Sequence, residues 1–183
     1  MKTIGFPISL KENENRRAII PFQISNITTP ELLYFEKGYG DKLGISDEEY
    51  IACGCHVCGR QECLTKDIIC DPKIGDAEYL ATLQNDQIIF GWVHATQNRD
   101  ITDILIKNHL TAYAWEKMYD RGKHVFWRNN ELAGEASVMH AFQCFGKMPY
   151  ETKAAVIGKG NTARGAMDCL TILNKQRRIG NEI

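Results

Sequence analysis

The most informative stretch of this 183-residue sequence is Lys153-Ala-Ala-Val-Ile-Gly-Lys-Gly-Asn-Thr-Ala-Arg-Gly-Ala-Met167, which has the pattern of a strand, a glycine turn and the start of a helix. The spacing Gly158-x-Gly160-x-x-Ala163 matches the G-x-G-x-x-G/A pattern of dinucleotide-binding turns. In such a turn the first glycine permits a tight bend and the second lets a pyrophosphate approach the N–H groups of the helix N-terminus. The small third residue keeps the helix close to the strand. We therefore predict that Gly158, Gly160, Asn161 and Ala163 bind a dinucleotide.

The sequence after this predicted helix does not continue as a nucleotide-binding domain would. The residue that reads the ribose is expected about 20 residues beyond the turn, which falls at Arg177-Arg178. These arginines belong to a polar tail, residues 175–183, without the apolar pattern of a strand. Because such a domain needs several more strands, we interpret residues 149–183 as the first β-α unit of an incomplete NAD(P)-binding domain. The tail fits a frameshift or a premature stop in a longer gene.

Residues 1–148 have the pattern of an α/β domain with a mostly parallel, Rossmann-like sheet, because apolar segments alternate with amphipathic ones. Residues 146–150 break this pattern and mark the predicted domain boundary. The segment Gln87–His94 is apolar on both faces, as an interior parallel strand is. The predicted strands are Thr3–Phe6, Leu32–Phe35, Asp67–Cys70, Gln87–His94 and Thr111–Ala114; the predicted helices follow the capping box Ser46–Glu49, cover Ile101–Leu105 and run from Leu132 to Phe145.

Composition and charge exclude several classes of protein. Hydrophobic residues make up 44% and charged residues 25% of the chain, as in a globular protein with a real core. The formal net charge of -1 gives no general affinity for nucleic acid or for an anionic membrane. No apolar run approaches the roughly 20 residues that a membrane-spanning helix needs, and from residues 1–7 we expect no signal peptide.

The seven cysteines allow two interpretations. An odd number without an export signal favours reduced thiols in the cytoplasm. Five of the cysteines lie between Cys53 and Cys70, and the spacing C-x-C-x₂-C-x₄-C with His56 inside it would also allow a zinc site. This run lacks the paired C-x₂-C spacing of established zinc motifs and crosses predicted helix and strand ends, so its thiols would point in different directions. We therefore favour free thiols and predict no metal.

Several ordered segments give the chain a family resemblance from residue 3 to about residue 174. It resembles the alanine dehydrogenase and pyridine nucleotide transhydrogenase superfamily and, within it, the N5-(carboxyethyl)ornithine synthases. The segments that carry the resemblance are Ile4-Gly-Phe-Pro, Glu14-Asn-Arg-Arg-Ala-Ile-Ile-Pro21, Phe35-Glu-Lys-Gly-Tyr-Gly40, Ser46-Asp-Glu-Glu-Tyr, Asp67-Ile-Ile-Cys-Asp-Pro-Lys-Ile-Gly-Asp76, Phe90-Gly-Trp-Val-His-Ala95, Glu131-Leu-Ala-Gly134 and Val156-Ile-Gly-Lys-Gly-Asn161.

The resemblance implies a reductive condensation of two small molecules. Pyruvate and the side-chain amine of ornithine, or of lysine, would form an imine that NADPH reduces, with NADH as the other possible cofactor. The superfamily's pyruvate-binding arginine falls on Arg16, its substrate lysine on Lys73 and its catalytic histidine on His94. The resemblance also implies a homo-oligomer.

The three residue types suit these roles. A bidentate guanidinium is the best holder of a keto-acid carboxylate, and a lysine adds a second positive charge near it. A histidine can cycle a proton near neutral pH, and His94 would end a strand at the edge where open α/β sheets bind ligands. Without the resemblance, Arg16 with Arg17 would be a solvated pair, Lys73 a surface lysine and His94 an ordinary strand-end histidine. The other histidines, His56, His109, His124 and His140, have structural or surface roles in our interpretation.

Two other functions remain open at this stage. An alanine dehydrogenase would use ammonia and NADH in place of ornithine and NADPH. An orphan catalytic domain would bind a keto acid, or pair with another subunit, without catalysis. Because hydride transfer needs a cleft between two complete domains, we expect the 183 residues alone to turn over slowly or not at all. The sequence does not determine the amine substrate, the stereochemistry or the choice between NADP and NAD.

Overall fold

The computed structural model describes the backbone of residues 1–179 and the side chains of residues 1–174. The chain divides into two compact units, Met1–Met118 and Tyr119–Ile183, which we describe one at a time. We call them unit 1 and unit 2. Among the described residues, no helix combines the length and apolar character that crossing a membrane requires.

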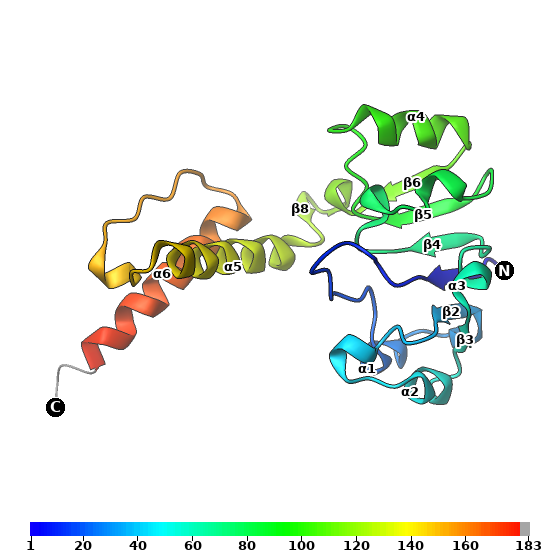
Figure 1. Cartoon of the computed structure of the whole chain (residues 1–183), viewed down its shortest axis with the longest axis horizontal. Coiled ribbons are helices and arrows are strands. Elements are labelled where there is room, and N and C mark those ends of the chain that lie inside the picture. Colours follow the sequence, from blue (N-terminus) through cyan, green and yellow to red (C-terminus); the bar gives the residue numbers. More distant parts are fainter. Residues whose placement is uncertain (180–183) are drawn as a thin grey trace. The chain divides into compact units, whose positions relative to one another are not determined.

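Unit 1 is built on a parallel sheet of six strands (Figure 1). The strands stand in the order β3-β2-β1-β4-β5-β6, and each pairs with its neighbours in parallel. This is the doubly wound order, in which the direction of winding reverses between β1 and β4. The strands are β1 (Ile4–Phe6), β2 (Leu33–Glu36), β3 (His56–Cys58), β4 (Ile68–Cys70), β5 (Ile88–Gly91) and β6 (Thr111–Ala114).

Short helices connect these strands. The α2 helix (Asp47–Ala52) begins at the predicted capping box, in which the Glu49 carboxylate accepts the N–H of Ser46 at 2.9 Å. The α4 helix (Arg99–Lys107) is capped by the side chain of Asn98, which accepts from the N–H of Asp100. The other helices of unit 1 are α1 (Pro21–Ile24) and α3 (Arg60–Cys63), with the 3-10 turns η1 (Pro30–Leu32), η2 (Asp41–Leu43), η3 (Ile74–Asp76), η4 (Leu80–Thr82) and η5 (Trp115–Lys117).

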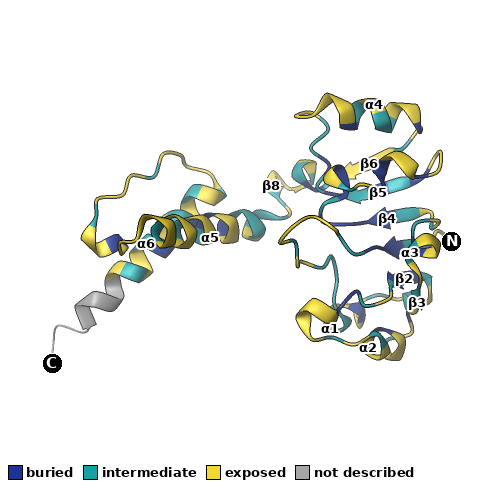
Figure 2. Cartoon of the chain, viewed as in Figure 1, coloured by how far each residue is buried: buried dark blue, intermediate teal, exposed yellow. Residues whose placement is uncertain are grey.

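The core of unit 1 lies along the central strands, which Figure 2 shows in dark blue. Ile69 of β4 and Ile89 of β5 are fully buried and pack with Ile74, Val93 and Ile101. A second cluster holds the β1–β2 side of the sheet together and is aromatic, with stacked, tilted or edge-on ring pairs among Phe6, Phe35, Tyr39 and Tyr50. The predicted parallel α/β fold is therefore confirmed.

One predicted strand of unit 1 is shorter in the structure. The segment predicted as Gln87–His94 is a strand only over Ile88–Gly91. The chain leaves the sheet after Gly91 and reaches His94, whose φ of 57° is left-handed and incompatible with a strand. A turn follows, closed by a hydrogen bond from the N–H of Gln97 to the carbonyl oxygen of His94 at 2.9 Å. The apolar residues Trp92 and Val93 extended the strand pattern beyond its real end.

Unit 2 consists mainly of two long helices, α5 (Trp127–Phe145) and α6 (Asn161–Ile179). They pack at close range because two glycines face backbone: a Cβ on Gly134 would lie 2.0 Å from the carbonyl oxygen of Thr162, and one on Gly165 would lie 2.0 Å from that of Glu131. A two-stranded hairpin of β7 (Tyr119–Asp120) and β8 (Lys123–His124) precedes α5, and the 3-10 turn η6 (Pro149–Glu151) follows it.

The strand predicted at the start of the glycine motif is absent. Residues 153–157 have no strand structure, and Ile157 is 98% exposed. A strand forms only when a neighbour pairs with its N–H and C=O groups, and the described residues of unit 2 include no parallel neighbour for this segment. The helix predicted after the glycine turn is present as α6.

The division into units differs from the predicted domain limit at residue 148. Helix α5 belongs to unit 2 because it packs against α6, so the structural division falls between Met118 and Tyr119. The division of function between a substrate-binding part, residues 1–148, and a cofactor-binding part, residues 149–183, stays a prediction. The frameshift proposed for the polar tail concerns residues 175–183, of which 180–183 lie outside the described residues.

Candidate functional site

The candidate site lies at the carboxyl edge of the sheet in unit 1, where the winding reverses between β1 and β4. Open α/β sheets bind their ligands in the crevice at such a switch point. The loop after β1 carries Arg16, and the loop after β4 carries Lys73. Strand β5, the next neighbour of β4, continues into His94. All three residues predicted for substrate chemistry therefore follow the carboxyl ends of adjacent parallel strands.

The loop after β4 sits directly on the end of β5. The N–H of Asp71 donates to the carbonyl oxygen of Phe90 at 3.2 Å, and the N–H of Gly75 donates to that of Trp92 at 3.1 Å. Glycine is required at two contacts, because a Cβ on Gly91 would lie 2.0 Å from the carbonyl oxygen of Asp71, and one on Gly75 would lie 2.0 Å from that of Val93. This close seating brings the Lys73 loop next to the segment that leads to His94.

Asp71 is the buried anchor of this loop, with an exposure of 0%. Its carboxylate accepts hydrogen bonds from the Tyr79 hydroxyl at 2.6 Å and from the N–H of Lys73 at 2.8 Å. Burial raises the pKa of Asp71 above its usual range, and the hydrogen bonds from Tyr79 and Lys73 offset only part of that effect. Asp71 thus fixes the backbone of Lys73 without reaching solvent itself.

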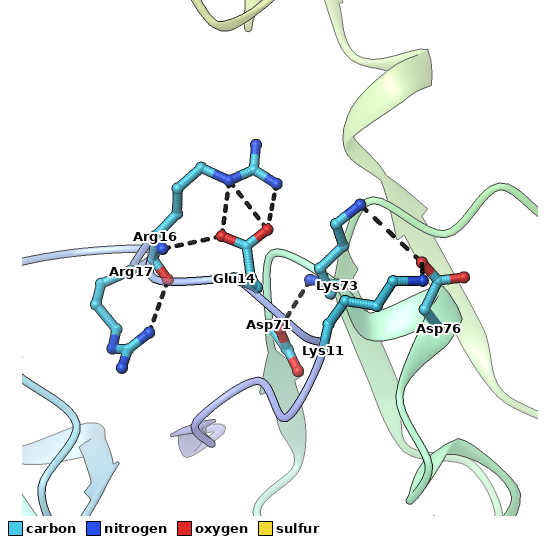
Figure 3. A network of polar contacts seen from close by, with 7 residues as sticks. All are labelled: Lys11, Glu14, Arg16, Arg17, Asp71, Lys73 and Asp76. Carbon is cyan, nitrogen blue, oxygen red and sulfur yellow. Dashed lines mark hydrogen bonds and ion pairs between the residues drawn. The ribbon is translucent and has the colours of Figure 1, made fainter. Parts of the chain in front are cut away.

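The side chain of Lys73 emerges beside a second cation (Figure 3). Its Nζ lies 4.0 Å from Oδ2 of Asp76, and the same oxygen accepts a hydrogen bond from Nζ of Lys11 at 3.0 Å. One carboxylate is therefore shared between two ammonium groups. Among these three side chains one positive charge remains unneutralised, and an anionic ligand can pair with it.

Arg16 is held by a buried carboxylate. Its Nε lies 2.8 and 3.1 Å from the two oxygens of Glu14, and its Nη2 lies 2.5 Å from Oε2. The Glu14 side chain is only 6% exposed. Burial alone would raise the pKa of Glu14, but hydrogen bonds from Arg16 and the charges of Arg16 and Lys73 lower it overall. Glu14 therefore interacts electrostatically with both predicted substrate residues. Figure 3 shows its carboxylate hydrogen-bonded to Arg16.

The neighbouring Arg17 has a different role. Its Nε donates to the carbonyl oxygen of Tyr39, and its guanidinium lies 5.2 Å from the centre of the Tyr39 ring. The Tyr39 hydroxyl accepts from the N–H of Ala18 at 2.9 Å. These contacts clamp the loop after β1 onto the aromatic part of the core. Arg17 is thus a structural residue, while the Arg16 side chain stays 48% exposed and within reach of a ligand.

His94 is held in a strained backbone conformation by a carboxylate from another element. Oε1 of Glu116, in η5, accepts the N–H of His94 at 2.6 Å, and Oε2 accepts that of Val93 at 3.2 Å. The imidazole is parallel to the Trp92 ring at 6.2 Å. Its Nδ1 is buried and has no hydrogen-bond partner among the described residues. Strained backbone and unsatisfied buried polar atoms both cluster at functional sites.

The predicted cofactor turn belongs to unit 2. Gly158 has a φ of 138°, which a residue with a side chain would rarely adopt, and a Cβ there would lie 3.4 Å from that of Ala163. A Cβ on Gly160 would meet nothing within 4 Å, so the space in front of the helix is open. Asn161 begins α6, and the N–H of Arg164 closes the first turn onto the Gly160 carbonyl oxygen at 3.0 Å. Residues 158–160 thus leave the N-terminus of α6 uncovered by any atom near Gly160.

The cysteine run does not gather its side chains. Among the described residues, no three His, Cys, Asp or Glu side chains are grouped as a metal ion requires. His56, inside the run, stacks on Tyr34 with ring centres 4.6 Å apart. All seven cysteines are free thiols, and burial raises the pKa of Cys55 to about 11. Such thiols stay protonated at neutral pH.

Of the cavities lined by described residues, one in unit 1 and one in unit 2 differ in the charge of their walls. One of about 400 Å³ lies in unit 2 and is mainly apolar, with Met139, Phe142 and Leu173 in its lining. The other, of about 220 Å³, lies in unit 1 beside the Lys73 loop, with Lys11, Asp76 and other charged residues in its lining. The first is larger, but the second carries the charged groups that recognise a small ionic substrate.

The family follows from a comparison with known proteins. Residues 5–128 match the family model described as alanine dehydrogenase/PNT, N-terminal domain. The chain belongs to this family. It is 30% identical over 198 residues to an N(5)-(carboxyethyl)ornithine synthase of Clostridium botulinum, covering 96% of this chain and 60% of that protein. An alanine dehydrogenase of Methanococcus maripaludis is 29% identical over 140 residues, covering 74% of this chain and 38% of its own length.

Solved structures of this family have the same fold. An L-alanine dehydrogenase superposes with a TM-score of 0.72 at 19% identity, covering 93% of this chain and 52% of its own. A transhydrogenase from Sinorhizobium meliloti superposes with a TM-score of 0.69 at 19% identity, and the match covers 94% of this chain and 54% of the transhydrogenase chain. The chain thus spans about 60% of the length of the first N(5)-(carboxyethyl)ornithine synthase it matches. It spans about half of these solved chains.

Sequence reasoning missed the carboxylates that hold the predicted residues. Glu14, Asp71 and Glu116 each bind the backbone or side chain of a predicted site residue or its neighbour. Glu14 had a local signal, because it stands two residues before Arg16 in the segment that carries the family resemblance. Glu116 had none, because it contacts His94 across 22 positions of sequence.

Proposed function

We propose that unit 1 binds a 2-keto acid through Arg16 and Lys73, and that His94 serves as the acid and base of a reductive condensation with an amino-acid side-chain amine. The reaction is that named by the N(5)-(carboxyethyl)ornithine synthases, with pyruvate and ornithine as substrates. The observation that carries this proposal is the position of Arg16, Lys73 and His94 after adjacent strands at the switch point of the sheet.

The charges of the site suit a keto-acid carboxylate. Glu14 orients the Arg16 guanidinium, and the exposed part of that side chain can meet a second carboxylate from solvent. Lys73, whose backbone Asp71 fixes, adds a positive charge for the carboxylate or the keto oxygen. Two cations that approach one small anion both neutralise and orient it.

His94 supplies the proton chemistry in this proposal. The amine nitrogen bonds to the keto carbon, the carbonyl oxygen leaves as water, and His94 donates and recovers the protons of these steps. The carbon–nitrogen double bond is then reduced. When bound, a reduced nicotinamide dinucleotide supplies the hydride. Gly158, Gly160, Asn161 and Ala163 would hold its pyrophosphate at the N-terminus of α6.

An alanine dehydrogenase-like reaction is the second candidate, supported by the similarity to alanine dehydrogenases. It would use the same keto-acid site but take ammonia as the amine. The preference for NADP over NAD, the homo-oligomeric state and the cytoplasmic location predicted from the sequence stay predictions. The same holds for slow turnover by the 183 residues alone.

Calorimetric titration of the 183-residue chain with pyruvate tests the proposed site. Arg16→Met removes the charge-assisted hydrogen bonds to the carboxylate, each of which contributes about 1.5–3 kcal/mol. Since 1.4 kcal/mol corresponds to tenfold in affinity, we expect R16M to bind pyruvate at least about tenfold more weakly than the wild-type chain.

Arg99→Met is the matched control for this titration. Arg99 lies on α4, is 91% exposed in its side chain and forms only a loose ion pair with Asp103 at 3.6 Å. R99M should bind pyruvate as the wild type does. Equal affinity in R16M and the wild type, or no pyruvate binding by the wild-type chain, contradicts the proposed function.

A further inference from the structure

The cavity of about 220 Å³ in unit 1 lies beside the proposed keto-acid site. Asp76 forms part of its wall, and Oδ2 of Asp76 lies 3.0 Å from Nζ of Lys11 and 4.0 Å from Nζ of Lys73. Tyr79 forms another part of the wall, and its hydroxyl donates a hydrogen bond to Asp71, the anchor of the Lys73 loop. A ligand in this cavity would therefore be a neighbour of whatever Lys73 holds.

The walls of the cavity carry both signs of charge. Lys11 and Arg60 are positive, while Glu12, Asp76 and Glu78 are negative. A site for a simple anion would exclude the carboxylates, and a site for a simple cation would exclude the guanidinium. The mixture instead complements a ligand that carries a carboxylate and an ammonium group together. An amino acid is the common small molecule with both.

Arg60 is fixed in place before any ligand arrives. Its Nη1 donates to the carbonyl oxygen of Ile8 at 3.0 Å and to Oε2 of Glu36 at 2.9 Å. Its guanidinium lies 5.3 Å from the centre of the Tyr79 ring. Glu36 also accepts the N–H of Ile8 at 2.7 Å, so the wall is tied to the end of β2. A preorganised guanidinium loses little freedom when it binds a carboxylate.

The size of the cavity agrees with a small ligand. Pockets for drug-sized ligands have volumes of about 300–1,000 Å³, and this cavity is smaller. The head of an amino acid, with its α-carbon, carboxylate and ammonium group, needs only part of such a space. The rest of a diamino acid can then extend toward Lys73.

We propose that this cavity binds the α-carboxylate and α-ammonium groups of the amine substrate, which is a diamino acid such as ornithine. Arg60 binds the carboxylate, while Glu12 and Glu78 bind the ammonium group. The side-chain amine extends past Asp76 to the keto acid. This inference rests on the proposed function and adds to it the site that selects a diamino acid over ammonia. An ammonia-dependent dehydrogenase needs no such pocket.

Calorimetric titration with ornithine and with 1,4-diaminobutane tests the cavity. The two ligands carry the same reacting amine, and 1,4-diaminobutane lacks the α-carboxylate. We expect the wild-type 183-residue chain to bind ornithine at least tenfold more tightly than 1,4-diaminobutane. We also expect the double variant Glu12→Gln with Glu78→Gln to weaken ornithine binding at least tenfold. Both glutamates are exposed, so the variant keeps the fold.

The control variant and the pyruvate titration separate this inference from the proposed function. Glu31→Gln changes an exposed glutamate in η1 that does not line the cavity, and it should leave ornithine binding unchanged. Pyruvate binding should be unchanged in all these variants. Equal affinity for the two amines, or undiminished ornithine binding in the double variant, overturns the cavity proposal while Arg16-dependent pyruvate binding still supports the proposed function. Absence of pyruvate binding contradicts the proposed function. The ornithine titrations contain no pyruvate, so they still decide the cavity proposal by comparing the double variant with the wild type.

Discussion

Two carboxylates at the edge of the sheet show how environment sets the charge of a residue. Glu14 and Asp71 are both buried, yet the pKa of Glu14 is lowered and the pKa of Asp71 is raised. Glu14 has Arg16 as a direct partner, whereas Asp71 is held by neutral donors, the Tyr79 hydroxyl and a backbone N–H. Burial raises the pKa of a carboxyl group. A charged partner can cancel that rise, whereas a neutral hydrogen-bond donor cancels only part of it.

The raised pKa of Asp71 predicts a pH dependence of stability. A folded-state pKa above the unfolded value of about 3.9 means that the folded state binds the proton more tightly. The contribution of Asp71 to stability is thus full below the unfolded pKa and falls as the pH rises through the folded one. Relative to Asp71→Asn, the wild-type chain should lose stability from pH 4 to pH 7 in urea denaturation.

Asp67 serves as a control, because its effect on stability should change with pH in the opposite direction. It accepts from the N–H and the hydroxyl of Thr3 at 2.7 and 2.8 Å, and these hydrogen bonds lower its pKa. Relative to Asp67→Asn, the wild-type chain should therefore gain stability as the pH rises. If the free energy of unfolding of the wild type, relative to that of D71N, stays constant or increases with pH, the pKa of Asp71 is not raised in the folded state.

Removal of the Glu116 carboxylate should lower the stability of the protein. Its carboxylate accepts two backbone N–H groups, from Val93 and His94, and holds the left-handed turn at His94. Hydrogen bonds to a charged group contribute about 1.5–3 kcal/mol. We expect Glu116→Ala to lower the free energy of unfolding by about 2 kcal/mol in urea at pH 7. Glu116→Gln, which keeps one acceptor, should lose less. A loss below about 0.5 kcal/mol in E116A would show that the turn does not depend on Glu116.

The secondary-structure elements of unit 1 were largely predictable because their signals are local. The capping box at Ser46–Glu49 and the apolar segments of β1, β2, β4 and β6 are properties of neighbouring residues. The end of β5 was not predictable, because the turn at His94 depends on Glu116 from another element. The residues 153–157 have strand composition, but a strand also needs a partner, which composition cannot supply.

The Lys73 loop packs directly on the end of β5, so replacing the glycine at this contact should destabilise the fold. In Gly91→Ala the new Cβ would lie 2.0 Å from the carbonyl oxygen of Asp71 and 2.9 Å from Cγ2 of Ile74. Because backbone must move, we expect a loss of about 3 kcal/mol or more in the free energy of unfolding. Gly59→Ala is the control, since its Cβ meets nothing within 4 Å and its φ is -70°. A G91A variant as stable as G59A would mean that the loop does not sit on β5 as described.

At the scale of the whole molecule, the residues proposed for substrate binding and those proposed for cofactor binding lie in different units. Arg16, Lys73, His94 and the mixed-charge cavity belong to unit 1, and the glycine turn belongs to unit 2. The residues proposed for the keto-acid site and for the cofactor turn could be named from the sequence, because both sets lie in short motifs. The sequence did not predict the cavity, because Lys11, Arg60 and Glu78 follow β1, β3 and β4 and meet only after β3, β2, β1 and β4 have paired.

Substrate binding to unit 1 can be located independently of turnover. In unit 1 the proposed keto-acid site lies beside the polar cavity, while unit 2 contains the larger apolar one. A keto acid bound at the proposed site would lie in unit 1, and one bound in the apolar cavity would lie in unit 2. The two sites would also surround it with different side chains, which are cationic in unit 1 and mainly apolar in unit 2. A measurement that reports on every backbone amide separates them.

Titration of the ¹⁵N-labelled chain with pyruvate, followed through its amide NMR signals, tests the keto-acid site most directly. We predict that the shifts concentrate in residues 14–16, in residues 71–76 and around His94. In the R16M variant the same shifts should need at least about tenfold more pyruvate, because one charge-assisted contact is lost. Shifts confined to the lining of the unit 2 cavity around Met139 and Leu173, or no shifts at all, would contradict the account.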